Sequence, residues 1–295
     1  MYERASSMHI RGLRPVPYTS TMESVAYVIN TTPKYFYLLP LHLTCLFRYS
    51  AVSPAVSPVV SPVVSPVVSL AVFLATEAPD HPDITALCTA FPQLQILPLT
   101  HANDGFFESR AAACAALPAK YTLIFPIQED FILEARPTLQ EAIALFTDPA
   151  VASVRLMPCP APAPNAPSYK ENHWKILDFE TNEYVFTYQA TIWRREVYQA
   201  FMDELILHVA TEFGTALTPA QKAQIAIRYN LAEIARGQAI LQRLTTSLLH
   251  LSCCRAGSQP NAVYLAPWPY RPTAVVRGRL EPWARELAER EGVPF

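Results

Sequence analysis

Short apolar runs alternate along this chain with longer segments whose apolar residues recur at helical spacing. The runs that predict strands are 25–30, 70–75, 94–97, 121–133, 151–157 and 184–188. The segments that predict helices are 33–49, 83–91, 106–117, 138–146, 218–234 and 282–290. Thr218 and Gln221 have the spacing of a capping box at the start of the helix predicted at 218–234. Strands that alternate with helices of about ten residues predict an α/β fold with a mostly parallel central sheet flanked by helices.

The run at 121–133, YTLIFPIQEDFIL, is rich in aromatic and β-branched residues and has no helical stripe. It therefore predicts a strand that is buried on both faces. The polar residues Gln128, Glu129 and Asp130 follow its apolar core. Open α/β sheets bind ligands at the carboxyl ends of their strands, and acids there suit a divalent cation held against a phosphate. The same pattern also fits a strand that ends where the chain reaches water.

Composition limits the function classes. Hydrophobic residues make up 51% and charged residues 16%, so a large core is expected. The net charge of −2 and the lack of a Lys/Arg-rich run argue against binding nucleic acid through a broad basic face. Seven glycines and no GxxxxGK, GxGxxG or GxSxG motif argue against P-loop proteins, kinases and standard dinucleotide oxidoreductases. Six cysteines without a CxxC pair suggest free thiols in a reducing compartment, and hence a cytoplasmic location.

A tetrapeptide repeat, AVSPAVSPVVSPVVSPVVS, occupies residues 51–69. Its regularly spaced prolines block a helix and a central strand, so we expect an extended surface loop and no membrane-spanning segment there. Residues 1–23 carry charges without an apolar signal-peptide core and predict a flexible extension. Residues 24–295 are then expected to form a single domain with the repeat as an insert.

Six segments in order resemble a known family: LAVFLATE (70–77), YTLIFPIQEDFIL (121–133), VASVRLMP (151–158), YQATIWRRE (188–196), NLAEIARGQ (230–238) and VVRGRLEPWARELAEREGV (275–293). Their order and spacing resemble the GT-A-fold nucleotide-sugar glycosyltransferases, in particular a viral and bacterial family-2-like branch active in glycan biosynthesis. The resemblance implies a GT-A-like (Rossmann-like) sheet with a short antiparallel addition. It also implies transfer of a hexosyl or deoxyhexosyl group from a nucleotide-diphosphate donor to a glycan or glycoprotein acceptor.

In that family the acidic motif after the central strand positions Mn²⁺ or Mg²⁺ on the donor diphosphate. The resemblance assigns this role to Asp130 and leaves Glu129 for the donor or the acceptor, because Gln128 stands where the usual Asp-x-Asp has its first acid. Thr31 and Glu77 follow the first two predicted strands and are expected to contact the nucleoside. Thr31 and the two residues after it equally fit a helix cap.

The segment at 188–196 lies under the sugar in the resembling family. Tyr188, Gln189 and Trp193 are therefore expected at the sugar and acceptor site, with Trp193 as an apolar platform and Gln189 bonding hydroxyls. A buried Trp193 in the core is the alternative. The resemblance places the carboxylate base of an inverting reaction at Glu233, with Glu212 as its rival. Glu233 fits a surface acid on a helix equally well.

The sequence is also compatible with two other functions. Gln128 in place of the first acid is also expected of a catalytically inactive GT-A-like scaffold that binds a glycan or a protein. A nucleotidyltransferase uses similar metal chemistry at the edge of a sheet, and it would release pyrophosphate.

Overall fold

A computed structural model describes residues 24–50, 70–99, 105–134, 139–156, 168–169, 171–176, 190–218, 220–222, 224–225, 261–264, 270–271 and 273–294. The extension at 1–23, the repeat at 51–69 and the strand predicted at 184–188 lie outside these residues.

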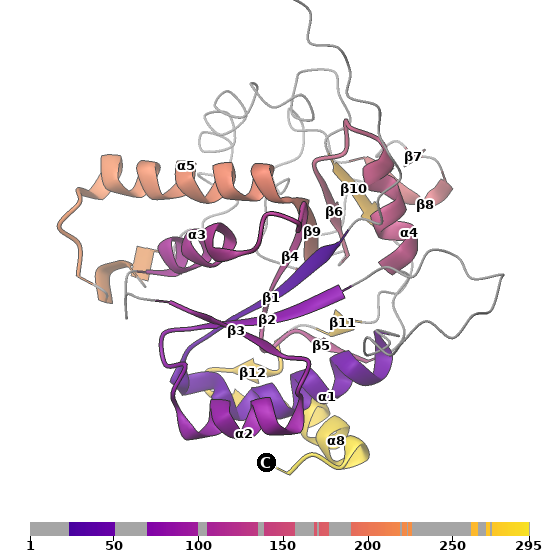
Figure 1. Cartoon of the computed structure of the whole chain (residues 1–295), viewed down its shortest axis with the longest axis vertical. Helices are drawn as coiled ribbons and strands as arrows, with labels where there is room; N and C mark the ends of the chain where they lie inside the picture. Colours follow the sequence, from indigo (N-terminus) through magenta and orange to yellow (C-terminus); the bar gives the residue numbers. More distant parts are fainter. Residues whose placement is uncertain are drawn as a thin grey trace, which may run out of the picture.

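A nine-stranded sheet forms the centre of the fold (Figure 1). In spatial order its strands are β3 (Gln95–Pro98), β2 (Leu70–Thr76), β1 (Val25–Thr31), β4 (Leu123–Gln128), β9 (Thr191–Arg194), β6 (Ser153–Arg155), β10 (Asn261–Tyr264), β8 (Glu171–Ile176) and β7 (Ser168–Tyr169). Strands β9 and β8 run opposite to their neighbours on both sides, and the other four pairings, β3 with β2, β2 with β1, β1 with β4 and β6 with β10, are parallel. This confirms the expected α/β fold with a mostly parallel sheet and a short antiparallel addition.

Helices cover both faces of the sheet, because side chains of a strand point alternately to either side. In β1, Tyr27 and Ile29 pack with α1 (Leu39–Tyr49), α2 (Pro82–Ala90) and α4 (Leu139–Ala144). Ala26 and Val28 pack on the other face with α3 (Phe106–Ala116) and α5 (Arg195–Phe213). Figure 1 shows α3 and α5 on the side of the sheet opposite to α1 and α2.

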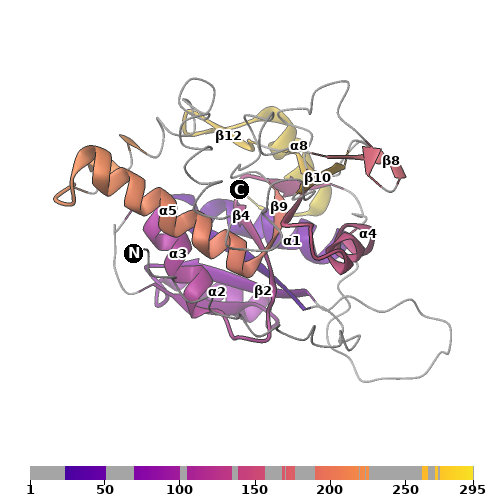
Figure 2. The same cartoon turned by 90° about the horizontal axis from the view of Figure 1, so that it is seen from above.

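The C-terminal segment packs against the outer side of α1. The helix α8 (Pro282–Glu291) contributes Ala284, Leu287 and Ala288 to a small core with Leu41 and Cys45 of α1. The carboxylate of Glu291 pairs with Arg48 and accepts a hydrogen bond from the Tyr49 hydroxyl at 2.7 Å. A short hairpin of β12 (Val275–Val276) and β13 (Arg279–Leu280) precedes α8. Figure 2 shows β12 and α8 together beside the C-terminus.

Three segments differ in detail from their predictions. The helix predicted at 33–49 is a 3₁₀ helix, η1 (Pro33–Leu38), followed by α1. The helix predicted at 138–146 is α4 followed by a 3₁₀ turn, η2 (Leu145–Thr147). The run at 121–133 is not one strand: β4 ends at Gln128, the chain turns, and β5 (Ile132–Leu133) pairs with β11 (Tyr270–Arg271) in a separate sheet.

Two adjacent arginines fix the junction between β9 and α5. Arg194 donates to the carbonyl oxygens of Phe146, Asp148 and Val151 at 2.7–2.9 Å. Arg195 donates to carbonyl oxygens at the end of α3 and just beyond it, those of Ala115, Leu117 and Pro118. Because backbone carbonyls at the ends of helices and in loops otherwise lack partners, these two side chains join the loops on both sides of the sheet.

Candidate functional site

Strands β1, β2 and β4 end together at one edge of the sheet. Thr31 is paired with Thr76, and Asn30 is paired with Gln128. The last residues of three neighbouring parallel strands therefore stand side by side, as expected for the ligand-binding edge of an open α/β sheet.

The acidic turn, residues 128–131, follows β4 at this edge. Its backbone closes through a hydrogen bond from the Phe131 N–H to the Gln128 carbonyl at 3.2 Å. Glu129 is buried, with 8% of its surface exposed, whereas Asp130 is partly exposed. One carboxyl group is thus held within the protein and its neighbour reaches toward solvent.

Burial changes the proton affinity of both acids. It raises the pKa of Glu129 to about 8, a shift that the neighbouring Asp130 increases and the Arg110 guanidinium reduces. It raises the pKa of Asp130 to about 6. At neutral pH the turn therefore carries one largely ionised and one largely protonated carboxyl group. A bound cation would favour the ionised form of both.

Thr31, Thr76 and Glu77 stand at the ends of the two strands next to β4. Thr31 and Thr76 are buried, and Glu77 is partly buried. The Thr76 hydroxyl accepts a hydrogen bond from the Ala78 N–H at 3.2 Å. Thr32, rather than Thr31, occupies the N-cap position of η1, and its side chain makes no cap hydrogen bond. Thr31 and Glu77 thus share the edge of the sheet with Glu129 and Asp130.

Trp193 was expected at the sugar site, but the structure places it in the core. Its side chain is fully buried, and its ring stacks on Phe201 with centroids 5.7 Å apart. It pairs with Ile124, four residues before the end of β4, so it lies toward the opposite edge of the sheet. A sugar platform needs an exposed ring face, so the platform prediction is wrong and the alternative of a core residue is confirmed.

The other predicted sugar and base residues, Tyr188, Gln189 and Glu233, lie outside the described residues. Glu212, the rival base, is in the last turn of α5 and pairs with His208 at 3.2 Å. The reciprocal capping box predicted at Thr218 and Gln221 is present: the Gln221 Oε1 accepts from the Thr218 N–H, and the Thr218 Oγ1 accepts from the Gln221 N–H.

Three polar residues near the acidic turn escaped the sequence analysis. Asn30 is largely buried, and its Nδ2 has no hydrogen-bond partner within the described part of the chain. Arg110, the one cation in the Ala-rich helix α3, is buried with its guanidinium 3.5 Å from the ring centroid of Phe106. His42 is buried on α1. A polar residue within an apolar segment was the available signal in each case.

The described residues contain no group of three or more His, Cys, Asp or Glu side chains arranged to hold a metal ion. The acidic turn offers two carboxyl groups, of which Asp130 is the more accessible. Mg²⁺ is commonly held by one or two carboxylates together with phosphate oxygens of a substrate. The site therefore fits a cation shared with a phosphate and does not fit a cage built by the protein alone. No described helix has the length and apolar character needed to cross a bilayer.

Comparison with known proteins gives only distant likenesses. No protein-family model and no curated protein matches the sequence significantly. Among solved structures, TarS of S. aureus aligns with a TM-score of 0.48 and 12% identity over 91% of this chain, which spans only 39% of that chain. A shorter form of TarS in complex with UDP-GlcNAc aligns with a TM-score of 0.46 and 10% identity over 84% of this chain and 57% of that one.

The mannosyltransferase PcManGT from Pyrobaculum calidifontis, in complex with GDP-Man and Mn²⁺, aligns with a TM-score of 0.42 and 12% identity. The alignment covers 78% of this chain and 76% of that chain. With TM-scores below 0.5 and identities of 10–12%, these likenesses carry no functional assignment for this chain.

Proposed function

We propose that this protein is a glycosyltransferase that moves a hexosyl or deoxyhexosyl group from a nucleotide-diphosphate donor to a glycan or glycoprotein acceptor. The observation that carries the proposal is the acidic turn at the edge of the sheet where β1, β2 and β4 end in register. The order of the family-like segments in the sequence adds to it.

Asp130 is the proposed ligand of Mn²⁺ or Mg²⁺, since it is the more exposed of the two acids and has the lower pKa. The cation would offset the negative charge that develops on the leaving nucleoside diphosphate. Glu129 contributes charge beside it when it is ionised. Thr31 and Glu77, on the adjoining strand ends, are the proposed contacts of the nucleoside.

The acceptor side of the proposal rests on residues outside the described structure. Gln189 and Tyr188 are proposed to bind sugar hydroxyls, and Glu233 is proposed to take the proton of the acceptor hydroxyl in a single inverting displacement. Cytoplasmic location is part of the same proposal.

Release of nucleoside diphosphate tests the proposal directly. Purified protein is incubated with a panel of nucleotide sugars and Mn²⁺ or Mg²⁺, without an acceptor, and slow hydrolytic release of UDP or GDP is measured. We expect Asp130→Ala to abolish release while the melting temperature stays close to that of the wild type. Asp203→Ala, an exposed acid on α5, is the matched control and should leave release unchanged. Release that survives Asp130→Ala would remove the metal role of this residue.

A binding scaffold without activity is the second candidate, because Gln128 replaces an acid and the turn supplies only two carboxyl groups. Calorimetry with UDP or GDP and Mn²⁺ distinguishes the two functions. The scaffold predicts no nucleotide binding at millimolar concentration, whereas the transferase predicts binding that depends on Asp130. Release of pyrophosphate from a nucleoside triphosphate would instead indicate a nucleotidyltransferase.

A further inference from the structure

A chain of buried hydrogen bonds reaches the acidic turn from inside the protein. The Tyr270 hydroxyl donates to the Tyr27 hydroxyl at 3.5 Å, and the Tyr27 hydroxyl lies 3.0 Å from Nε2 of His42. Nδ1 of His42 lies 3.1 Å from the carbonyl oxygen of Glu129. The four residues come from β11, β1, α1 and the acidic turn, so the chain connects four separate parts of the fold.

The partners determine the direction of every bond in this chain. A carbonyl oxygen only accepts, so Nδ1 of His42 must carry the hydrogen. His42 is buried, and burial lowers its pKa to about 4, so the ring is neutral near pH 7 and Nε2 is an acceptor. The Tyr27 hydroxyl then donates to Nε2 and is free to accept from Tyr270. The less common Nδ1–H tautomer follows from the geometry alone once the ring is neutral.

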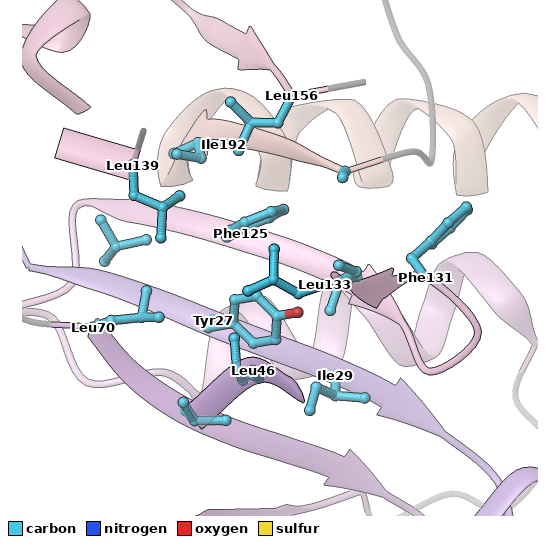
Figure 3. Packing of buried hydrophobic residues seen from close by; sticks show 14 of the residues in the cluster. Tyr27, Ile29, Leu46, Leu70, Phe125, Phe131, Leu133, Leu139, Leu156 and Ile192 are labelled. Carbon is cyan, nitrogen blue, oxygen red and sulfur yellow. The ribbon is translucent and has the colours of Figure 1, made fainter. Parts of the chain in front are cut away.

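The surroundings of the chain are apolar. Tyr27, His42 and Tyr270 are all buried, and the Tyr27 and Tyr270 rings each meet the Phe125 ring edge-on. Figure 3 shows Tyr27 among buried apolar side chains that include Phe125 and Leu133. A hydrogen bond in such a place is costly to lose, because the remaining partner is left buried and unpaired.

The C-terminal segment also forms a hydrogen bond with the backbone of the acidic turn. The Ala274 N–H donates to the carbonyl oxygen of Asp130 at 3.0 Å. Thr273, just before it, has a φ of 64°, a conformation that is rare for a β-branched residue. Tyr270 begins the same segment and pairs with Leu133 across β11 and β5. The backbone carbonyls of both acids are therefore fixed, one by α1 and one by the C-terminal segment.

We propose that His42 is a positioning residue: its Nδ1–H, held in place by Tyr27 and Tyr270, fixes the backbone of the acidic turn and thereby aims the Asp130 carboxylate. The importance of this for catalysis rests on the function proposed above. The fixing of the turn itself can be measured without any substrate.

The test uses the full chain and three variants. His42→Phe removes both hydrogen bonds, His42→Asn keeps an N–H near the position of Nδ1, and Tyr27→Phe removes the donor to Nε2. Tyr198→Phe, a buried tyrosine on the other face of the sheet, is the matched control. If His42→Phe fails to fold, Tyr27→Phe alone still decides the outcome, because it changes one oxygen atom.

Nitrogen NMR and amide hydrogen exchange report on positioning. We expect wild-type His42 as the Nδ1–H tautomer, and exchange of the Phe131 and Ala274 amides about tenfold faster in His42→Phe. His42→Asn should restore part of the protection, Tyr27→Phe should lose part of it, and Tyr198→Phe should retain all of it. An Nε2–H tautomer, or equal exchange in His42→Phe and Tyr198→Phe, would overturn the proposal.

Affinity for Mn²⁺ with UDP or GDP separates this proposal from the proposed function. If His42 is merely structural, His42→Phe should lower the melting temperature without changing the affinity of the folded protein for Mn²⁺ with UDP or GDP. If His42 is a positioning residue, His42→Phe should lower that affinity about tenfold. Unchanged affinity in a folded His42→Phe protein would refute the aiming of Asp130. If wild-type protein binds no Mn²⁺–nucleotide, the sugar-transfer proposal fails, and tautomer and exchange still decide whether His42 fixes the turn.

Discussion

Glu129 and Asp130 are adjacent in sequence, yet their carboxyl groups lie in different surroundings in the folded protein. The side chain of Glu129 is buried and that of Asp130 reaches partly into solvent, so desolvation raises the pKa of Glu129 more. A proton on Glu129 removes the repulsion between the two groups when no cation is bound. The proton on Glu129 therefore lowers the electrostatic cost of the acidic turn near neutral pH. A bound cation, as proposed above, would favour the ionised form of Glu129.

This difference predicts a pH dependence of stability. A carboxyl group whose pKa is raised by folding binds more protons in the folded state, so the free energy of unfolding falls as pH rises from about 4.5 to about 8. Glu129→Gln should flatten this dependence and make the variant more stable than wild type above about pH 8, by about 1.4 kcal/mol for each unit of pKa shift removed.

Urea unfolding between about pH 5 and about pH 9 measures the effect. Glu286→Gln, an exposed acid on α8, is the control and should follow the wild-type curve. A Glu129→Gln variant that keeps the wild-type pH dependence would show that Glu129 is ionised in the folded protein throughout this range.

Trp193 allows a second prediction at a single residue. Its fully buried indole contacts the rings of Tyr198 and Phe201, so Trp193→Ala should destabilise the protein by about 3–5 kcal/mol. Chemical denaturation gives this free energy. A variant that keeps wild-type stability but loses affinity for a sugar would instead restore the platform role that the resemblance implied.

At the level of elements, local patterns predicted those whose signal is contained in their own residues. The uniformly apolar runs at β1 and β2 predicted buried strands to within a residue or two, and the Thr218–Gln221 spacing predicted a capping box that the structure contains. The split of 121–133 into β4 and β5 was not predictable in this way. It depends on β11, whose Tyr270 pairs with Leu133 from far along the chain.

The hairpin of β12 and β13 offers a prediction about one element. Its turn residues Arg277 and Gly278 both have positive φ, at 51° and 76°. Two-residue hairpin turns with two positive φ values prefer Asn-Gly, because Asn adopts this conformation at lower cost than other residues with a side chain. Arg277→Asn should therefore raise the free energy of unfolding by about 0.5–1 kcal/mol. Thermal or urea unfolding checks it, and lower stability would indicate that the exposed Arg277 side chain makes a contact worth more than the strain.

At the scale of the whole molecule, some residues of the candidate site could be predicted from the sequence and others could not. Glu129, Asp130, Thr31 and Glu77 follow predicted strands, and a parallel sheet brings such residues to one edge by its topology. His42 and Arg110 lie near the acidic turn, and Tyr270 connects to it through Tyr27 and His42, because α1, α3 and β11 pack around β1, and no local pattern records this packing. Trp193 shows the opposite error, because an amphipathic residue in a polar segment can serve equally well in a core.

The largest test of the architecture concerns the Val-Ser-Pro repeat, which joins Ser50, the residue after α1, to the start of β2 at Leu70. Deleting residues 51–66 leaves three residues in this connection, a common length for a link from a helix to a strand, and one able to span roughly 14 Å when extended. Since closure entropy changes slowly with loop length, we expect the free energy of unfolding to stay within about 1 kcal/mol of wild type.

Urea unfolding and release of nucleoside diphosphate should both be measured on the deletion variant. A second variant, in which Gly and Ser replace the repeat at equal length, separates the effect of loop length from that of sequence. If the deletion unfolds the protein but the Gly/Ser variant does not, the repeat is a necessary spacer between α1 and β2. If both variants unfold, the repeat packs against the domain and the assignment of a dispensable surface loop is wrong. Unchanged stability and activity in both would leave the β1–α1–β2 unit, which supplies Tyr27, His42 and Thr31, independent of the insert within it.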